Sequence, residues 1–184
     1  MIRYLITDGS AALDQRAWLA KLNHWITERG VELVQLRERS LTTRELVALA
    51  RKVLALPNPH GTRILVNDRA DVAIASGAHG VHLRDGSVSP SLVAAQGFTV
   101  SVSVHHLRQL SMAEGADFIL LAPIFAPLSK IGGAPPLGTD AIRRACELTA
   151  IPVLALGGIT EMNARECVEA GAAGIAGISY FDKA

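Results

Sequence analysis

Short apolar runs alternate with amphipathic, helix-like segments along the whole chain. The apolar runs have the length of strands that are buried in a parallel sheet. They predict strands over residues 4–7, 33–36, 64–67, 80–83, 100–103, 118–122, 153–156 and 174–179. The segments between them predict helices over residues 15–29, 43–54, 71–76, 89–96, 107–114, 139–148 and 163–170. Such an alternation of strands and helices is typical of an α/β protein with a parallel sheet.

Local signals support these boundaries. Thr42 or Thr43 can cap the helix predicted from residue 43, because a hydroxyl oxygen accepts hydrogen bonds from unpaired backbone amides. Four glycines each follow a helical run, where a left-handed residue commonly ends a helix: Gly30, Gly77, Gly115 and Gly171. Three of them stand in a Gly-Ala pair just before the next strand, which indicates a repeated β-α unit.

Eight strands with interleaved helices predict a closed TIM (β/α)₈ barrel that forms one domain over residues 1–184; the alternative is an open, doubly wound sheet. The chain is short for a barrel, which commonly has about 250 residues. Only residues 180–184 follow the last strand, so we expect the eighth helix to be missing or truncated. We therefore expect an uncovered apolar patch outside the first and last strands, and a homo-oligomer that covers it.

Composition narrows the functional classes. The chain has 184 residues, 49% of them hydrophobic, and a formal net charge of +1. Without a basic run or a strong net charge we expect no nucleic-acid partner. No apolar stretch approaches the roughly 20 residues of a membrane span, so we expect no membrane partner. The apolar run at the N-terminus is too short for a secretory signal, and Cys146 and Cys167 read as buried free thiols, so we expect a cytoplasmic protein.

Polar residues close most of the predicted strands. Barrel active sites lie at the carboxyl ends of the strands, so these residues are the candidates for chemistry. They are Asp8, Gln35, Arg37, Arg39, Asn67, Asp68, His82, Asp85, Ser103 and His105. A purely structural barrel would not require polar groups at one rim, so the pattern predicts a ligand site there.

The ends of the last two strands predict a phosphate site. Gly157 and Gly158 follow the seventh strand and open a predicted helix, and residues 177–179 end the eighth with Gly-Ile-Ser. Glycines let backbone amides approach an anion, and phosphate commonly binds at this place in such barrels. The alternative is that the glycines only form tight turns.

Two cations are candidates for binding a phosphorylated ligand. Arg37 can grip a phosphate with parallel hydrogen bonds, and Lys130 supplies a point charge from the Pro- and Gly-rich loop of residues 126–133. The alternative for Arg37 is a salt bridge with Glu38 or Asp68 at the rim. The alternative for Lys130 is a solvated loop charge.

Oxygen ligands and one histidine complete the rim. Asp68, after Asn67, can bind Mg²⁺ together with substrate phosphates, or it can cap the third helix. His105 can cap the fifth helix or act at the rim. We find no cysteine and histidine spacing of the kind that binds zinc.

Taken together, these residues resemble the thiamine phosphate synthase/TenI family. The resemblance runs from Tyr4 to Ser179. It rests on the joint order and spacing of short stretches: residues 4–8, 34–39, 65–69, 80–83, 101–105, 115–118, 122–125, 152–159 and 170–172.

The resemblance implies an enzyme of thiamine biosynthesis, a transferase that joins hydroxymethylpyrimidine diphosphate to thiazole phosphate and releases diphosphate. By motif position it implies that Gln35 holds the pyrimidine and that Asp68 binds Mg²⁺. It further implies a diphosphate site of Arg37, Asn67, Ser103 and Lys130, and a thiazole phosphate site of Gly158, Ile178 and Ser179. We count Arg37, Ser103 and Lys130 as catalytic, because they would stabilise the charge of the leaving group.

The sequence departs from the synthases at several positions. Where synthases carry a second metal-binding carboxylate this chain has Ser87, which should weaken Mg²⁺ binding, and Asp85 lies two residues too early. Arg39 replaces a lysine, and residues 126–129 replace a threonine-rich run. The runs around Arg39 and Ser87 are closer to TenI proteins, some of which isomerise thiazole phosphate with a histidine where this chain has Pro123. A thiazole phosphate isomerase and a non-catalytic phosphate-ligand binding or regulatory protein are therefore the alternatives.

Overall fold

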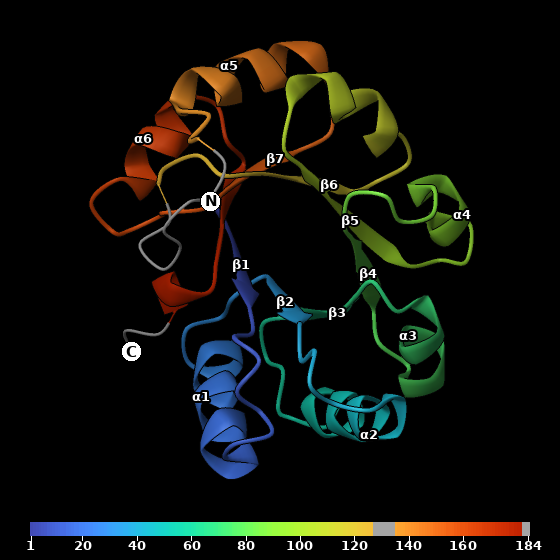
Figure 1. Ribbon diagram of the computed structural model, residues 1–184. Coiled ribbons are helices and arrows are strands. Elements are labelled where there is room, and N and C mark those ends of the chain that lie inside the picture. The colour runs from blue at the N-terminus through green and yellow to red at the C-terminus, as the bar shows by residue number, and fades with distance from the viewer. Residues whose placement is uncertain (127–134, 182–184) are drawn as a thin grey trace.

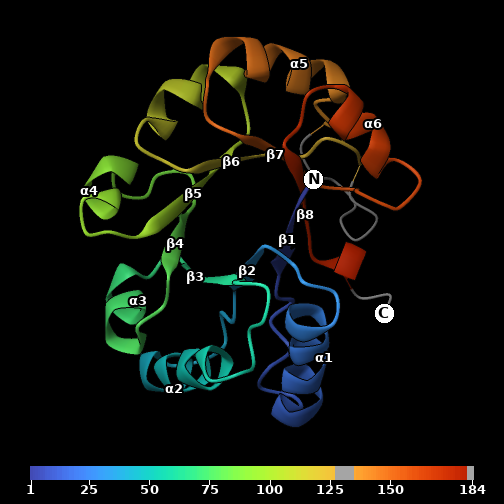
Figure 2. The same ribbon diagram turned by 180° about the vertical axis from the view of Figure 1, so that it is seen from behind.

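The chain folds into a closed barrel of parallel strands surrounded by helices (Figure 1). The coordinates are a computed structural model, which describes residues 1–126 and 135–181. The described strands are β1 (Ile2–Ile6), β2 (Leu33–Leu36), β3 (Arg63–Asn67), β4 (Gly80–Leu83), β5 (Thr99–Val104), β6 (Phe118–Leu121), β7 (Val153–Leu156) and β8 (Gly174–Gly177). Each pairs with its neighbour in sequence, and β8 pairs with β1, as Figure 2 shows from behind. The predicted TIM barrel is confirmed, and the open sheet is excluded.

The helices lie on the outside of the barrel. They are α1 (Gln15–Thr27), α2 (Thr43–Leu54), α3 (Ala70–Ser76), α4 (Pro90–Ala94), α5 (Thr139–Leu148) and α6 (Ala164–Glu169), with 3₁₀ turns η1 (Leu107–Ala113) and η2 (Ser179–Phe181). The sequence predicted each segment between strands but gave residues 107–114 as an ordinary helix. Thr42 caps α2, because its side chain accepts from Glu45 N and Glu45 bonds back to it. Gly77 ends α3 at φ +79°, as its place in the sequence predicts.

The barrel interior has an apolar floor. Alternate residues of the strands point inward, and one buried cluster fills the lower part of the barrel. Its members are Tyr4, Ile6, Leu33, Leu65, Leu120, Leu154 and Ala176. Further along the same strands the inward positions become polar, beginning with Gln35 after Leu33 and Asn67 after Leu65. The interior is therefore packed at one end and polar at the end where the strands finish.

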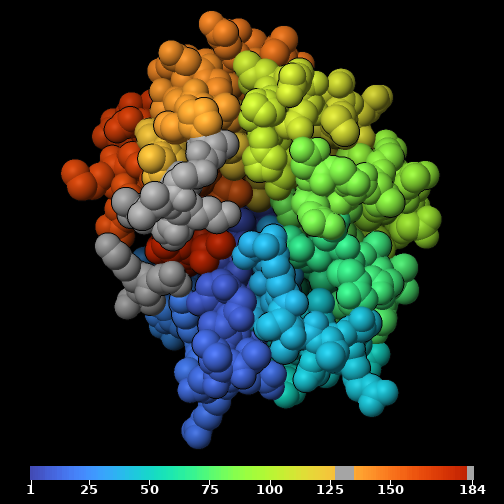
Figure 3. Space-filling view, in the orientation of Figure 1, coloured from blue at the N-terminus to red at the C-terminus, as the bar shows by residue number. Residues whose placement is uncertain are grey.

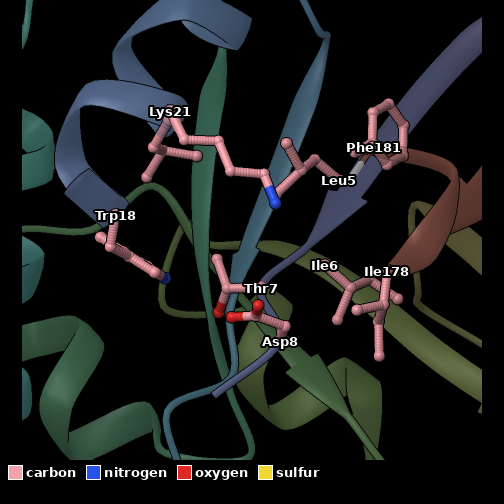
Figure 4. A pocket seen from close by; sticks show the side chains of 9 residues that line it. Leu5, Ile6, Thr7, Asp8, Trp18, Lys21, Ile178 and Phe181 are labelled. Atoms are coloured by element: carbon pink, nitrogen blue, oxygen red, sulfur yellow. The ribbon is translucent and has the colours of Figure 1, made fainter. Parts of the chain in front are cut away.

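The prediction of an uncovered apolar patch outside β1 and β8 is wrong for the described chain. Leu5 on β1 and Ile175 on β8 are buried. The C-terminal turn η2 folds back on α1, where the ring of Phe181 meets the ring of Trp25 edge-on at 4.9 Å and the Trp25 Nε1–H donates to Phe181 O. Between these elements a hollow of about 30 Å³ remains (Figure 4). This is roughly the share of volume of one water molecule.

Candidate active site at the carboxyl end of the barrel

Gln35 and Asn67 begin the polar layer inside the barrel mouth. They stand at the ends of β2 and β3, which pair in parallel, so their side chains meet. Gln35 Nε2 donates to Asn67 Oδ1 at 2.8 Å. Gln35 is buried, and its Oε1 has no hydrogen-bond partner among the described residues. A buried acceptor without a donor costs about 1–3 kcal/mol, so this atom is suited to a ligand N–H group.

A buried hydrogen-bonded chain crosses the barrel beside this pair. Tyr4 OH lies 2.9 Å from Ser101 Oγ, Ser101 Oγ lies 2.9 Å from His82 Nδ1, and His82 Nε2 lies 2.9 Å from Ser103 Oγ. Burial lowers the pKa of His82 to about 4, and the nearby charges of Arg37 and His105 act in the same direction against that of Asp68. His82 is therefore neutral at pH 7 and carries one ring proton.

The direction of donation along this chain follows from its buried end. Tyr4 OH is fully buried, and Ser101 Oγ is its partner among the described residues, so the phenol proton points to Ser101. Ser101 then donates to His82 Nδ1, and His82 Nε2–H donates to Ser103 Oγ. The hydroxyl proton of Ser103 is left for a ligand at the barrel mouth, which makes Ser103 a donor suited to an anion.

Arg37 lies two residues after Gln35, at the alternation of a strand, and so is expected on the same face. Its backbone N–H donates to Thr7 Oγ1 at 2.8 Å, which fixes the turn after β2. The guanidinium is half-buried, and burial, followed by the charge of Arg39, lowers its pKa. Arg37 forms a salt bridge with neither of the two acids that the sequence offered as partners. Glu38 accepts from the amides of Gly9 and Ala11, and Asp68 pairs with Arg84. Arg37 therefore presents its charge to the site.

Asp68 is held by the loop after β4. Its Oδ2 accepts from Arg84 Nε at 2.5 Å, and its Oδ1 accepts from the hydroxyl of Ser87. The alternative of a helix cap is wrong, because α3 follows Arg69 without a side-chain cap. Asp68 has φ +55°, a left-handed conformation that is uncommon outside glycine and better tolerated by aspartate than by most residues. The fold thus holds this carboxylate at the rim even though the left-handed backbone conformation of Asp68 costs conformational energy.

The residues around Asp68 do not fit a magnesium site. Both carboxylate oxygens are engaged, and Asp85 turns away to accept from Gln109 Nε2 at 2.9 Å. Among the described residues no group of three or more metal-binding side chains comes together. The hollow in front of Asp68 measures about 280 Å³ and is lined by more arginines (Arg37, Arg39, Arg69 and Arg84) than acids (Glu38 and Asp68). Such a lining repels a divalent cation and attracts an anion.

Gly158, Ile178 and Ser179 lie at the carboxyl ends of neighbouring strands, because β7 pairs with β8. None of their three amides donates a backbone hydrogen bond within the described chain. Gly158 has φ +63°, and a Cβ there would meet Ala126 O at 2.6 Å. The backbone at Ala126 passes so close to residue 158 that only glycine fits there. The two segments therefore follow neighbouring strands and have amides without a backbone partner among the described residues, and the phosphate site itself stays a prediction.

The helix predicted over residues 163–170 is confirmed as α6, but the glycines after β7 do not open it. The helix begins at Ala164 and has six residues. Asn163 bridges the intervening loop, because its Nδ2 donates to Gly158 O and its Oδ1 accepts from Thr160 N. The loop amides, rather than a helix N-terminus, are thus what this segment offers to an anion.

The remaining predicted residues divide into three groups. Lys130 lies outside the described residues. His105 is exposed, and its Nδ1 lies 2.9 Å from Ala122 O; the N-cap residue of η1 is His106, so the predicted cap by His105 is wrong and its role at the rim stays a prediction. Cys167 is buried, but Cys146 is exposed, so the expectation of two buried thiols holds for one of them.

Sequence reasoning missed two contributors to the site. Tyr4 starts the buried chain but stands in the middle of an apolar strand, so only alternation within β1 could have placed it inside the barrel. Arg84 follows β4 and stands three residues before Ser87, and no local pattern distinguishes it from a solvated surface arginine. Its pairing with Asp68, a residue of the neighbouring β3 end, is a tertiary contact that no local pattern marks.

Comparison with known proteins agrees with this geometry. A family model described as thiamine monophosphate synthase matches residues 3–181. The chain is 45% identical over 160 residues to the "putative thiamine-phosphate synthase 2" of Aquifex aeolicus (strain VF5), covering 85% of this chain and 86% of that one. It is 40% identical over 169 residues to the thiamine-phosphate synthase of Koribacter versatilis (strain Ellin345), covering 88% and 80%. The structure resembles thiamine phosphate pyrophosphorylase from Pyrococcus furiosus, with a TM-score of 0.79, 29% identity, and coverage of 97% of this chain and 85% of that one.

Proposed function

This chain belongs to the thiamine monophosphate synthase/TenI family, and from that premise we propose that it is a thiamine phosphate synthase. It joins hydroxymethylpyrimidine diphosphate to thiazole phosphate. The observation that carries the proposal is the barrel mouth itself. An unpaired buried acceptor at Gln35, a serine donor and unpaired arginine charge near it, and free amides after β7 and β8 together suit an aminopyrimidine, a diphosphate and a second phosphate.

The reaction needs leaving-group stabilisation more than a base. The bond between the pyrimidine methylene carbon and the diphosphate oxygen breaks, and diphosphate leaves with the electron pair. The thiazole nitrogen then donates its lone pair to the methylene cation and forms the new carbon–nitrogen bond. Positive charge and hydrogen-bond donors placed at the departing oxygens lower the barrier of the first step.

The residues of the mouth take roles according to their chemistry. Gln35 Oε1 accepts from the exocyclic amine of the pyrimidine, and Asn67, fixed by Gln35, binds the diphosphate with its remaining donors. Arg37 and the hydroxyl of Ser103 bind the same diphosphate. The amides of Gly158, Ile178 and Ser179 hold the thiazole phosphate. Lys130 is proposed as a further diphosphate ligand by its place in the family motif alone.

The alternatives are less well supported. Isomerisation of thiazole phosphate needs an acid–base group after β6, where this chain has Pro123. The Nδ1 of His105 lies 2.9 Å from the carbonyl oxygen of Ala122, just after β6, so this ring nitrogen is engaged with the backbone. A non-catalytic binder would require the phosphate-site amides but not the half-buried arginine and the serine donor beside the pyrimidine acceptor.

Product formation tests the proposal. Purified protein is incubated with both substrates, and thiamine phosphate is detected by its fluorescence after oxidation. We expect turnover that Arg37→Ala reduces by at least about 100-fold, the size expected for loss of a charge-stabilising donor. Arg44→Ala on the exposed face of α2 is the matched control and should leave turnover unchanged. Binding of thiazole phosphate without turnover would instead support the non-catalytic alternative.

Location and assembly stay predictions. No helix within the described residues is long and apolar enough to cross a bilayer. We propose a cytoplasmic protein whose partners are the two phosphorylated substrates and include neither nucleic acid nor membrane. The expected homo-oligomer stays a prediction, and burial of Leu5 and Ile175 within the chain removes the apolar patch that motivated it. The nearly balanced charge supports the part of this proposal that concerns nucleic acid.

A further inference from the structure

Arg84 lines two hollows, one at the barrel mouth and one that extends from the loop after β4 along α4 and η1. The first hollow contains Arg37, Asn67 and Asp68, and the second contains Ser103 and the loop after β4. Figure 3 views this end of the molecule, where the segments after β2 and β4 surround the centre of the barrel. Arg84 therefore shares one hollow with Arg37 and the other with Ser103.

The side chain of Arg84 is fixed in a way that leaves its charge available. Asp68 Oδ2 accepts from Nε alone, and Ser87 holds the other carboxylate oxygen. The terminal nitrogens of Arg84 make no hydrogen bond with any other residue for which a position is described, and the side chain is 68% exposed. Two parallel N–H groups in this orientation match two phosphate oxygens.

The charges around Arg84 favour an anion over a metal ion. Of the arginines that line the hollow beside Asp68, Arg69 is paired with Asp71 and Arg84 with Asp68, while Arg37 forms no ion pair within the described part of the chain. Glu38 is the second acid that lines the hollow, and its carboxylate accepts hydrogen bonds from two backbone amides. A divalent cation would have to displace Arg84 from Asp68 and then sit among the remaining guanidinium groups.

We propose that Arg84 replaces the divalent cation in this chain, so that the diphosphate is bound by guanidinium groups and leaves without Mg²⁺. Ser87, at the position of the missing carboxylate, acts with Asp68 to orient Arg84 rather than to bind metal. The identity of the ligand rests on the proposed function, whereas the binding of pyrophosphate without metal does not. Asp68 is then a positioning residue, and Arg84 is the group that touches the substrate.

Titration calorimetry with inorganic pyrophosphate tests this directly. We expect the protein to bind pyrophosphate in EDTA, and Arg84→Gln to weaken the affinity by at least about tenfold, the change expected on losing a charged hydrogen-bonding partner. Arg84→Lys should weaken it less, because the charge stays and the paired N–H groups are lost. Arg143→Gln is the control, because Arg143 also pairs with an aspartate at 2.5 Å but lies on α5. Circular dichroism verifies that each variant is folded.

Restoring the family's acid supplies the converse test. The double variant Arg84→Gln, Ser87→Asp should bind pyrophosphate only when Mg²⁺ is added. The inference is overturned if the unaltered protein needs Mg²⁺ to bind pyrophosphate, or if Arg84→Gln binds it as tightly as before. Turnover that requires Mg²⁺, together with failed binding in EDTA, would refute the inference and keep the proposed function. Binding in EDTA with no turnover under any condition would keep the inference and refute the proposed function.

Discussion

At the scale of single residues, the site is built from buried polar groups whose bonding is incomplete. Gln35 Oε1 lacks a donor and Ser103 has a proton to donate, so one position suits a ligand N–H group and the other an anionic oxygen. Both are fixed by neighbours within the barrel, Asn67 and His82. Fixing donors and acceptors before the substrate arrives lowers the reorganisation that the reaction requires.

Gln35→Leu should separate stability from function. It removes the unpaired buried acceptor and the bond to Asn67 together, so the free energy of unfolding should change by no more than about 1 kcal/mol. The Michaelis constant for the pyrimidine substrate should rise by at least about tenfold, because its amine loses its acceptor. Urea unfolding and steady-state kinetics measure the two quantities. A large loss of stability would show that Gln35 is structural.

His82 should carry its proton on Nε2 at neutral pH. This follows from the direction of donation that begins at Tyr4, and a two-bond ¹⁵N–¹H correlation spectrum distinguishes the two ring nitrogens. Tyr4→Phe removes the first donor and should raise the fraction of the Nδ1–H form, which leaves Ser103 as donor to His82 instead of to the ligand. A spectrum of the unaltered protein with the proton on Nδ1 would refute the assigned direction. His60, which is exposed, serves as the internal reference.

At the scale of elements, parallel pairing places the functional loops side by side. The pairing of β7 with β8 places the loop that contains Gly158 and the segment that contains Ile178 and Ser179 after neighbouring strands, and the pairing of β3 with β4 brings Asp68 next to Arg84. The glycine after β7 is needed because the chain after β6 crosses directly over it. Loop conformation, rather than helix charge, is therefore what would form the proposed phosphate site.

Gly158→Ala should damage this site more than a matched glycine elsewhere. Its new Cβ would meet Phe125 Cβ at 2.8 Å as well as the Ala126 carbonyl, so one of the two loops must move. We expect at least about tenfold weaker binding of thiazole phosphate, corresponding to about 1.4 kcal/mol. Gly61→Ala is the control, because Gly61 also has positive φ, +73°, but nothing lies within 4 Å of a Cβ there. It should cost about 1 kcal/mol of stability through backbone strain and leave binding unchanged.

At the scale of the whole molecule, the short 3₁₀ turn η2 follows β8 and packs on the outside of the barrel, where earlier strands are followed by a longer helical segment. The outer surface of β1 is covered by α1 and by η2, whose Phe181 is 1% exposed, whereas Ile175 on β8 packs in one cluster with Cys167 of α6. Figure 4 shows Trp18 and Lys21 of α1 on one side of the remaining hollow and Ile178 and Phe181 on the other. The segment that carries the Ile178 and Ser179 amides is therefore anchored by the same packing that completes the barrel.

Phe181→Ala should destabilise the barrel by about 3–5 kcal/mol, the usual cost of deleting a buried aromatic ring. Binding of thiazole phosphate should weaken as well, because η2 loses its contact with Trp25. Denaturant unfolding and calorimetry measure the two effects. Met162→Ala, at a residue that is 92% exposed, should change stability by less than about 0.5 kcal/mol. Unchanged stability in Phe181→Ala would mean that the turn does not hold the barrel closed.

The sequence by itself determined the order of strands and helices, the barrel, the capped start of α2 and the rim positions of Gln35, Arg37, Asn67 and Ser103. These depend on local periodicity, on short-range capping and on alternation along a strand, which a linear pattern records. Only the tertiary structure decided that Arg84 pairs with Asp68, that Tyr4 and His82 orient Ser103, and that Phe181 covers β1. Each of these contacts joins residues far apart in the chain, through side-chain directions that are set only when the barrel closes.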